Sequence, residues 1–423
     1  MRFDSLDDWL DWQMSLHSKA IDLGLARVSE VAQRLGIGKI AGKVITVAGT
    51  NGKGSTVASY ETWLHRAGYT VASYTSPHLL KYNERIKFAL QMVSDQSLCE
   101  AFDAIDQARG EIALTYFEFG TLAAIWLINR QQPDFAILEV GLGGRLDAVN
   151  IIDADMVHLT SIGLDHQSWL GNSREEIGFE KAGVLRDHIP VIVNDIDPPQ
   201  SVLDEIKRHG CRALFYQRDF SMRETDPECY QWQNGLLSLT LTPELPGSHQ
   251  VQNFAGVVAG LGELFDLESI EPAQLQENFK GTELAGRFQR IKTAAAAEVY
   301  VDVGHNADAA RALAENLSRM KKAGTRVVVL LGMLEDKDNA AFVSELLGVV
   351  DGWWLVGLDA DRGLDATRLA ERLDAQLQPE FQFEDADKAL DQALSSLGNQ
   401  DIMLVTGSFV TVEHFLKALT ENG

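Results

Sequence analysis

The chain has 423 residues, with 37 Lys and Arg against 61 Asp and Glu, which gives a net charge of −24. Both parts of the chain are acidic, since residues 1–285 hold 23 basic and 39 acidic residues and residues 286–423 hold 14 and 22. A chain with no basic segment is poorly suited to general nucleic-acid binding or to docking on anionic membranes, so neither partner is expected.

Short β-rich runs alternate with helical patterns in the first part of the chain. Buried strands are predicted over residues 43–49, 69–75, 135–141, 155–163 and 190–194. The helices between them are predicted to end at Ala67 and to cover 117–131 and 173–186, the last with a capping-box pattern at Ser173 and Glu176. Such alternation is typical of parallel strands joined by helical crossovers.

The alternation is interrupted once and then restarts. Residues 211–242 are predicted to form short strands around a turn at Asn234-Gly235, and a helix is predicted from about Gln250 to Phe265. Residues 281–291 are predicted to be a hinge, and the next strands are predicted over 299–304, 326–332, 352–358 and 402–408. A single core rarely exceeds about 300 residues, so we expect two α/β domains, 1–285 and 286–423.

Three features bear on the cellular compartment. The cysteines are odd in number and lack CxxC spacing, so they predict neither a disulfide framework nor a zinc site: Cys99, Cys211 and Cys229. The acidic start of the chain does not resemble a signal peptide, and no apolar run approaches the roughly 20 residues of a membrane span. A cytoplasmic protein is therefore expected.

The strongest local signal is the glycine-rich run GTNGKGST at residues 49–56, between a predicted strand and a predicted helix. Closely spaced glycines let backbone N–H groups surround phosphates, the helix N-terminus adds positive potential, and Lys53 can reach the terminal phosphates. The run departs from the strict P-loop pattern because Gly54 follows Lys53, so a simple glycine-rich turn is the alternative. The strand–loop–helix context favours nucleotide binding.

Polar side chains follow several predicted strands, at the edge where α/β sheets bind ligands. Glu139 ends one strand and is a candidate ligand for a hard cation, with the capping of a loop amide as the alternative. His166 follows another strand, and a structural role is as consistent with its position as a functional one. Lys181 lies in a predicted helix, where an ordinary surface lysine is the default. Arg287 in the predicted hinge can bind a phosphate or pair with a local acid.

Seven segments occur together and in order: GTNGKGST, TSPHL (75–79), LEVGLGGRLDA (138–148), LDH (164–166), EKAG (180–183), GRFQ (286–289) and DVGHN (302–306). This set resembles the folylpolyglutamate synthase/dihydrofolate synthase family of the Mur ligase superfamily over nearly the whole chain. The resemblance implies an ATP-binding P-loop domain with a mostly parallel sheet and a smaller C-terminal Rossmann-like domain, with the active site between them.

The family's chemistry is ATP-dependent amide formation. The resemblance implies that the γ-phosphoryl group of ATP passes to the carboxylate of dihydropteroate or a reduced folate. The amine of L-glutamate then attacks the acyl phosphate, and ADP and phosphate are released. The implied cofactors are ATP and Mg²⁺ at two sites, and the family is usually monomeric.

The resemblance also implies roles for matching residues. ATP contacts are implied for Thr50, Asn51, Gly52, Lys53, Gly54, Ser55, Asn253, Arg287 and Asp302. Metal ligands are implied for Ser76, Glu139, His166 and Lys181, the last as a carbamate that would offer an anionic oxygen. Catalytic roles are implied for Lys53, His166, Lys181 and His305, where His305 helps to place the incoming glutamate. The dihydropteroate site is implied for Ile21, Asp22, Leu23, Gly24, Thr115, Tyr116, Phe117, Glu118, Leu146, Asp147 and Ala148.

Two other functions stay open at this point. A Mur-type ligase acting on a cell-wall nucleotide precursor would be expected to carry a further N-terminal domain, whereas about 42 residues precede the first strand of the P-loop here. A nucleotide-dependent switch would need only the P-loop, and the remaining segments argue against it. The bifunctional ligase is the expected function.

Overall fold

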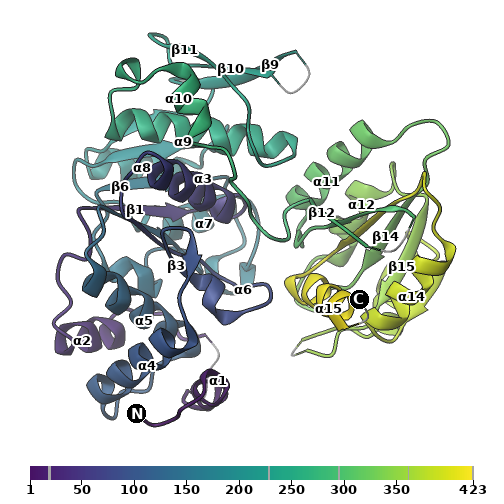
Figure 1. The fold of residues 1–423 in the computed structure, drawn as a ribbon, viewed down its shortest axis with the longest axis horizontal. Helices are drawn as coiled ribbons and strands as arrows, with labels where there is room; N and C mark the ends of the chain where they lie inside the picture. Colours follow the sequence, from purple (N-terminus) through teal and green to yellow (C-terminus); the bar gives the residue numbers. More distant parts are fainter. Residues whose placement is uncertain (18–20, 227–228, 294–295, 361, 422–423) are drawn as a thin grey trace. The chain divides into compact units, whose positions relative to one another are not determined.

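The computed structural model describes residues 1–17, 21–226, 229–293, 296–360 and 362–421. The chain forms two compact units, both drawn in Figure 1. Unit 1 comprises Met1–Glu244 and Gln250–Thr282, and unit 2 comprises Leu245–His249 and Glu283–Gly423. Each unit contains a largely parallel sheet with helices, which confirms the expected α/β fold class.

The main sheet of unit 1 has eight strands in the order β4-β3-β2-β5-β1-β6-β7-β8. All neighbours are parallel except the β2–β3 and β3–β4 pairs. The strands are β1 Lys43–Ala48, β2 Val71–Tyr74, β3 Ile86–Phe88, β4 Gln91–Met92, β5 Phe135–Glu139, β6 Met156–Leu159, β7 Pro190–Val193 and β8 Arg212–Phe215. The antiparallel edge formed by β3 and β4 was not predicted.

Helices cover both faces of this sheet (Figure 1). Alternate residues of β5 enter different cores, because successive side chains of a strand point to opposite faces. Ala136 and Leu138 pack in the core that includes α1, α2, α4 and α5, whereas Phe135 and Ile137 pack in the core that includes α3 and α9. The helices of this unit are α1 Leu6–Ser15, α2 Ala26–Arg34, α3 Lys53–Arg66, α4 Asp95–Arg109, α5 Tyr116–Gln131, α6 Gln167–Leu170, α7 Arg174–Ala182, α8 Gln200–Arg208, α9 Ser248–Leu264 (whose first residues belong to unit 2) and α10 Pro272–Glu277.

The interruption predicted over 211–242 is confirmed only in its later part, which forms a separate antiparallel sheet, because β8 at its start continues the parallel main sheet. The strands of the separate sheet are β9 Ser221–Asp226, β10 Cys229–Gln233 and β11 Ser238–Leu241. The turn at Asn234-Gly235 joins the last two strands, and Asn234 Oδ1 accepts a hydrogen bond from Leu237 N at 2.9 Å. Gly235 has a φ of 82°, which explains why glycine stands there.

The sheet of unit 2 has six strands in the order β12-β13-β17-β14-β15-β16, of which only β12 is antiparallel to its neighbour. The strands are β12 Gln289–Ile291, β13 Glu298–Val301, β14 Val327–Leu331, β15 Gly352–Val356, β16 Phe381–Phe383 and β17 Ile402–Thr406. The helices are α11 Ala307–Met320, α12 Asn339–Leu346, α13 Ala366–Leu373, α14 Ala386–Ser396 and α15 Phe409–Glu421. Part of the predicted hinge is therefore a strand of this sheet.

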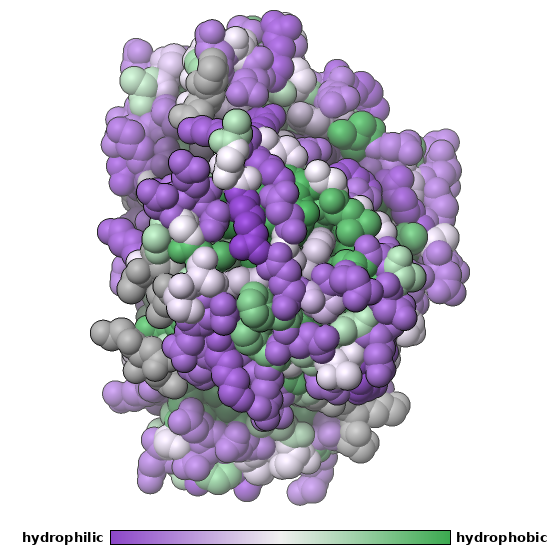
Figure 2. Space-filling view, turned by 90° about the vertical axis from the view of Figure 1, so that its right-hand side faces the viewer, coloured by the Kyte–Doolittle hydropathy of each residue, from purple (hydrophilic) through white to green (hydrophobic). Residues whose placement is uncertain are grey.

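One face of the molecule is mainly hydrophilic, as expected for a chain rich in charged residues (Figure 2). On this face, hydrophobic residues lie in small groups among the hydrophilic ones. Across the described ranges, none of the helices combines the length and apolar character needed to cross a membrane.

Candidate functional site

The P-loop, defined here as residues 49–56, joins β1 to the start of α3 at Lys53. Two glycines are needed in it for different reasons. A Cβ at Gly49 would lie 1.8 Å from Thr160 Oγ1, and Gly52 adopts a φ of 89°. Lys53 Nζ donates to Gly49 O at 3.1 Å and to Thr50 O at 3.0 Å, so its charge lies over the loop. A compact glycine loop at a helix N-terminus with a lysine above it is suited to bind phosphates.

Asn253, from α9, lies against the P-loop although it is about 200 residues away in sequence. A Cβ at Gly52 would lie 2.5 Å from Asn253 Oδ1. Asn253 Nδ2 donates to Gln250 Oε1 at 3.2 Å, and Gln250 Nε2 donates to Ser55 Oγ at 2.9 Å. The structure thus brings together the predicted ATP residues of unit 1: Thr50, Asn51, Gly52, Lys53, Gly54, Ser55 and Asn253.

Glu139 and Ser76 meet at the carboxyl edge of the same sheet. Glu139 ends β5, pairs in register with Val47 of β1, and is only 5 % exposed. Its Oε2 accepts a hydrogen bond from Ser76 N at 3.1 Å, because Ser76 follows β2 on the other side of β5. The carboxylate of Glu139 therefore caps a loop amide, which was the alternative to a metal-binding role. It lies one strand away from the P-loop, since β5 is the neighbour of β1.

Lys181 is not the surface lysine that is the default for its position. Its side chain is 5 % exposed, and its Nζ donates to Gly49 O at 2.7 Å, so it shares this acceptor with Lys53. Burial and, after it, the charge of Lys53 lower the pKa of Lys181 to about 7, although the charges of Asp165 and Asp147 oppose both effects. A buried amine with a pKa near neutrality is available as a nucleophile.

This pKa predicts a pH-dependent stability for the unmodified, metal-free protein. Lys181 has a pKa of about 7 in the folded chain against 10.5 ordinarily, so between these values the unfolded state binds more protons. The free energy of unfolding should rise as pH increases from 7 to 10.5, and below pH 7 the full cost of burying the charge is present. Denaturant unfolding of wild type and of Lys181→Met, in CO₂-free buffer at several pH values, measures this free energy. The stability advantage of the variant should shrink between pH 7 and 9.5, and a constant difference would contradict the assignment.

His166 is the N-cap residue that directly precedes α6, and it adopts a left-handed conformation with a φ of 52°. Its backbone N donates to Asp165 Oδ1 at 2.8 Å, and its Nε2 lies 3.9 Å from Asp165 Oδ2. Asp165 contributes to the electrostatic environment of Lys181, so the loop after β6 approaches the two lysines.

The described side chains near the P-loop include few that could bind a metal ion without a nucleotide. In the described part of the chain, no group of three or more His, Cys, Asp or Glu side chains lies close enough together to hold an ion. Mg²⁺ rarely uses such a cage and usually takes one or two carboxylates together with phosphate oxygens and water. The buried carboxylate of Glu139, with Ser76 beside it and the P-loop one strand away, fits a cation that binds together with a nucleotide.

The first two predicted dihydropteroate segments are joined by Arg27, which no sequence pattern indicated. Thr115 caps α5 in a capping box with Glu118, whose Oε2 accepts from Thr115 N at 2.8 Å. Glu118 Oε1 accepts from Arg27 Nη2 at 2.9 Å, and Arg27 Nη1 donates to Asp22 Oδ2 at 2.6 Å. The arginine therefore connects two segments that lie more than 90 residues apart.

The third segment lies against the second. Asp147 is buried, and its carboxylate accepts from Leu142 N at 2.8 Å and from Val149 N at 3.0 Å. Burial raises the pKa of Asp147 to about 6, although these amides lower it. A Cβ at Gly141 would lie 2.4 Å from the Phe117 ring, which shows how closely the loop approaches α5. The other predicted residues flank these contacts in sequence: Ile21, Leu23, Gly24, Tyr116, Leu146 and Ala148.

Arg85 is a second residue that the sequence did not single out. It is 8 % exposed, its Nε donates to His78 Nδ1 at 2.9 Å, and its guanidinium carbon lies 5.0 Å and 5.7 Å from the ring centroids of Tyr82 and Tyr116. Among the described residues no carboxylate forms an ion pair with it, whereas the equally buried Arg109 pairs with Asp106 at 2.7 Å. A buried guanidinium of this kind is suited to an anionic ligand.

Three predicted site residues lie in unit 2. Asp302 Oδ1 accepts from Gly304 N and Oδ2 accepts from Phe288 N, each at 2.7 Å, so its carboxylate orders the backbone on both sides. The Arg287 guanidinium carbon lies 5.3 Å from the Phe409 ring centroid. His305 Nδ1 lies 3.0 Å from Val303 O. Their contacts with substrates stay predictions.

Comparison with known proteins places these features in a family. The sequence matches the Mur ligase middle domain over residues 47–261 and the Mur ligase glutamate ligase domain over residues 286–409. It is 41% identical over 417 residues to the dihydrofolate synthase/folylpolyglutamate synthase of Escherichia coli K12, covering 98% of this chain and 95% of that protein.

Solved structures agree over the whole length. The structure of E. coli FolC in complex with DHPP and ADP matches with a TM-score of 0.91 at 40% identity, covering 99% of this chain and 98% of the other. A bifunctional folylpolyglutamate synthase/dihydrofolate synthase from Yersinia pestis, complexed with AMPPNP and Mn ion, matches with a TM-score of 0.90, the same identity and the same coverage. The chain belongs to the Mur ligase family and, within it, to the dihydrofolate synthases/folylpolyglutamate synthases.

Proposed function

We propose that this chain adds L-glutamate to dihydropteroate, giving dihydrofolate, and to reduced folates, with ATP cleaved to ADP and phosphate. The observation that carries the proposal is the buried Lys181, whose Nζ donates to the P-loop carbonyl of Gly49 at 2.7 Å. It places a buried amine beside Lys53 at a phosphate-binding loop, close to Asp147 of the predicted dihydropteroate site. The relatives named above support a site that holds a nucleotide and an acceptor together, because the solved structure of E. coli FolC contains both DHPP and ADP.

The chemistry explains why a nucleotide loop and an acceptor site must be neighbours. A carboxylate is a poor acyl donor, since its leaving group would be oxide. In the proposed reaction a carboxylate oxygen of the acceptor attacks the γ-phosphorus and the bond to ADP breaks. The amine of glutamate then attacks the acyl carbon, loses a proton, and phosphate leaves. Lys53 and the P-loop amides hold the phosphates, so catalysis rests on positioning and charge stabilisation.

The reaction uses ATP and a divalent cation, and we propose two Mg²⁺ sites. When bound, the cations supply charge neutralisation for the phosphate oxygens. Ser76 and Glu139 would hold the first, and His166 the second. In the structure Ser76 and Glu139 are already hydrogen-bonded to each other, and His166 lies on the loop that bonds to Thr50 of the P-loop.

We further propose that Lys181 is carbamylated. Its neutral amine would attack the carbon of CO₂, a C–O π pair would move to oxygen, and the nitrogen would lose a proton, leaving an anionic carbamate. The lowered pKa of Lys181 provides the neutral amine near pH 7. The product would replace a buried cation by an oxygen ligand for the second metal.

The remaining predictions concern the whole molecule. We propose that the active site lies between residues 1–285 and 286–423, because the site residues implied by the family divide between the two units, with the ATP residues Arg287 and Asp302 and the glutamate-placing His305 in the second. We also propose a cytoplasmic monomer without nucleic-acid or membrane partners, which the net charge of −24 supports.

ADP release tests the proposal directly. With ATP and Mg²⁺ present, release should require both L-glutamate and an acceptor, and it should occur with dihydropteroate and with tetrahydrofolate. Turnover with tetrahydrofolate alone would reduce the function to polyglutamylation. Release that ignores acceptor and glutamate would instead identify a nucleotide-dependent switch.

A further inference from the structure

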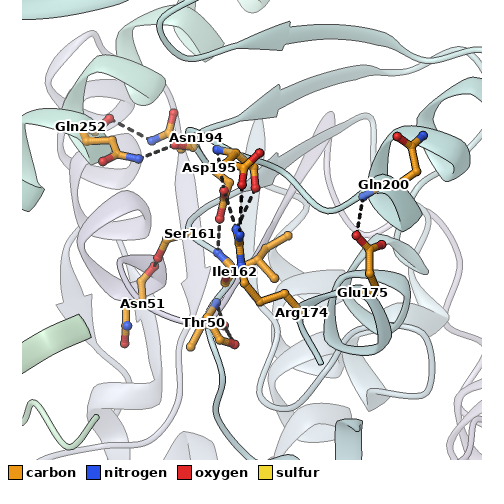
Figure 3. Close-up of polar contacts among 12 residues, drawn as sticks. Thr50, Asn51, Ser161, Ile162, Arg174, Glu175, Asn194, Asp195, Gln200 and Gln252 are labelled. Atoms are coloured by element: carbon orange, nitrogen blue, oxygen red, sulfur yellow. Dashed lines mark hydrogen bonds and ion pairs between the residues drawn. The ribbon is translucent and has the colours of Figure 1, made fainter. Parts of the chain in front are cut away.

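The loop after β6, residues 160–166, is bonded to the P-loop along one side (Figure 3). Thr50 N donates to Ser161 O at 2.7 Å, and Thr50 Oγ1 accepts from Gly163 N at 3.0 Å. Ser161 Oγ also donates to Asn51 O at 3.3 Å. The two residues on either side of Ile162 therefore fix Thr50, and the same loop continues to His166.

An ion pair holds the same loop from the other side, as Figure 3 shows. Ile162 N donates to Asp195 Oδ2 at 2.6 Å, and Ile162 O accepts from Arg174 Nε at 2.8 Å. Arg174 Nη2 donates to Asp195 Oδ1 at 2.8 Å, which closes the arrangement. Both backbone polar groups of one residue are thus bound by a charged pair, and Asp195 is only 6 % exposed. We call this pair the Arg174–Asp195 clamp.

The clamp also fixes the helix that carries Lys181. Arg174 is the first residue of α7 and Lys181 lies near its end, where its Nζ donates to Gly49 O at 2.7 Å. The helix therefore reaches the P-loop region at two points about two turns apart. At the end of β7, Asn194 adds a third connection, since its Nδ2 donates to Gln252 O at 2.9 Å, one residue before Asn253.

We infer that Arg174 and Asp195 are positioning residues that set the P-loop, the His166 loop and Lys181 in one arrangement. Neither residue is among those expected to touch a substrate, and both act through Ile162. A loop with no regular structure gains its order from such contacts, so loss of the clamp would let Thr50 and His166 move apart. The consequence is specific: binding of the nucleotide and of the divalent cation should weaken, while binding of the acceptor should not. The inference rests on the proposed function for its kinetic readouts.

The test uses the full chain with Arg174→Gln, Asp195→Asn and Arg174→Lys. Outer partners of metal and phosphate sites commonly change affinity or activity by about tenfold or more, so KM for ATP and the half-saturating Mg²⁺ concentration should rise by about that factor. KM for the acceptor should stay unchanged. Arg174→Lys should recover part of the loss, because lysine keeps the charge but cannot bond to Ile162 O and Asp195 together.

Glu175→Gln is the matched control. Glu175 is the next residue of the same helix, and its carboxylate accepts from Gln200 N at 2.9 Å and from Ser201 N at 2.8 Å, so it joins α7 to α8 rather than to the loop. Its substitution should lower the melting temperature without raising KM for ATP. If the clamp variants only lose stability, as this control should, the inference is wrong.

Titration with ADP and Mg²⁺ separates this inference from the proposed function, because it needs no turnover. Weaker ADP binding in the clamp variants supports the inference even if wild type shows no acceptor-dependent turnover, an outcome that would end the proposed function. Unchanged ADP binding in folded variants of an active ligase would overturn the inference alone.

Discussion

Replacing Lys53 by alanine is expected to lower kcat/KM for ATP by about a thousandfold, the order found when a charge-stabilising donor to a transferring group is removed. The lysine lies over the P-loop, with Nζ 3.0 Å from Thr50 O and 3.1 Å from Gly49 O, where a phosphate chain would bind. Its loss would also remove one cause of the lowered pKa of Lys181. Initial rates of acceptor-dependent ADP release measure the effect.

Lys43→Ala is the control for this experiment. Lys43 begins β1, ten residues before Lys53, and its side chain is exposed, so the variant should keep wild-type rates and stability. Near-normal turnover of Lys53→Ala would remove Lys53 from the mechanism and leave phosphate binding to the loop amides.

Lys181→Ala is expected to lose nearly all activity and to regain part of it when acetate or formate is added. The substitution leaves a space beside Gly49 O in which a short carboxylate can supply the anionic oxygens that a carbamate would provide. The rate should therefore rise and saturate with acetate, while wild type at matched ionic strength should not respond.

Lys207→Ala is the control for this experiment. It removes an exposed lysine from α8 and should neither lose activity nor respond to acetate. If Lys181→Ala behaved in the same way, the buried amine would have no part in catalysis. An unmodified Lys181 in the mass spectrum or electron density of fully active protein would exclude the carbamate while leaving the ligase function intact.

Local patterns allowed much of the fold to be predicted. Apolar β-branched runs identified β1, β5, β6 and β7, because strands buried on both faces lack the polar residues that would interrupt such runs. The capping box at Ser173 correctly marked the start of α7. The P-loop was recognisable because glycine spacing and strand–loop–helix context are both local.

Long-range contacts explain what could not be predicted. The local sequence of Lys181 indicates an ordinary helical lysine, and only the fold brings it to Gly49, 132 residues earlier. Arg27 gains its meaning from Asp22 and from Glu118, 91 residues away. The Arg174–Asp195 clamp joins two residues whose shared partner, Ile162, has no distinctive pattern. Such groups are specified by the order of strands in the sheet, which periodicity does not reveal.

The acidic composition also means that binding must depend on a few local groups. ATP, the acceptor and glutamate are all anionic, so a chain with a net charge of −24 cannot attract them through its overall field. A few buried or loop-bound cations must provide the recognition. Lys53 and Arg85 are candidates for this role in unit 1, and Arg287 is a candidate in unit 2.

The central claim is that an acceptor carboxylate becomes an acyl phosphate at this site, and oxygen-18 transfer tests it most directly. Dihydropteroate labelled in both carboxylate oxygens should yield phosphate that carries one labelled oxygen for each ADP released, because the attacking oxygen leaves with the phosphoryl group. The same reaction in labelled water with unlabelled acceptor should give unlabelled phosphate. Phosphate that draws its oxygen from water, with none from the acceptor, would contradict the account and show that the chain hydrolyses ATP without activating the acceptor.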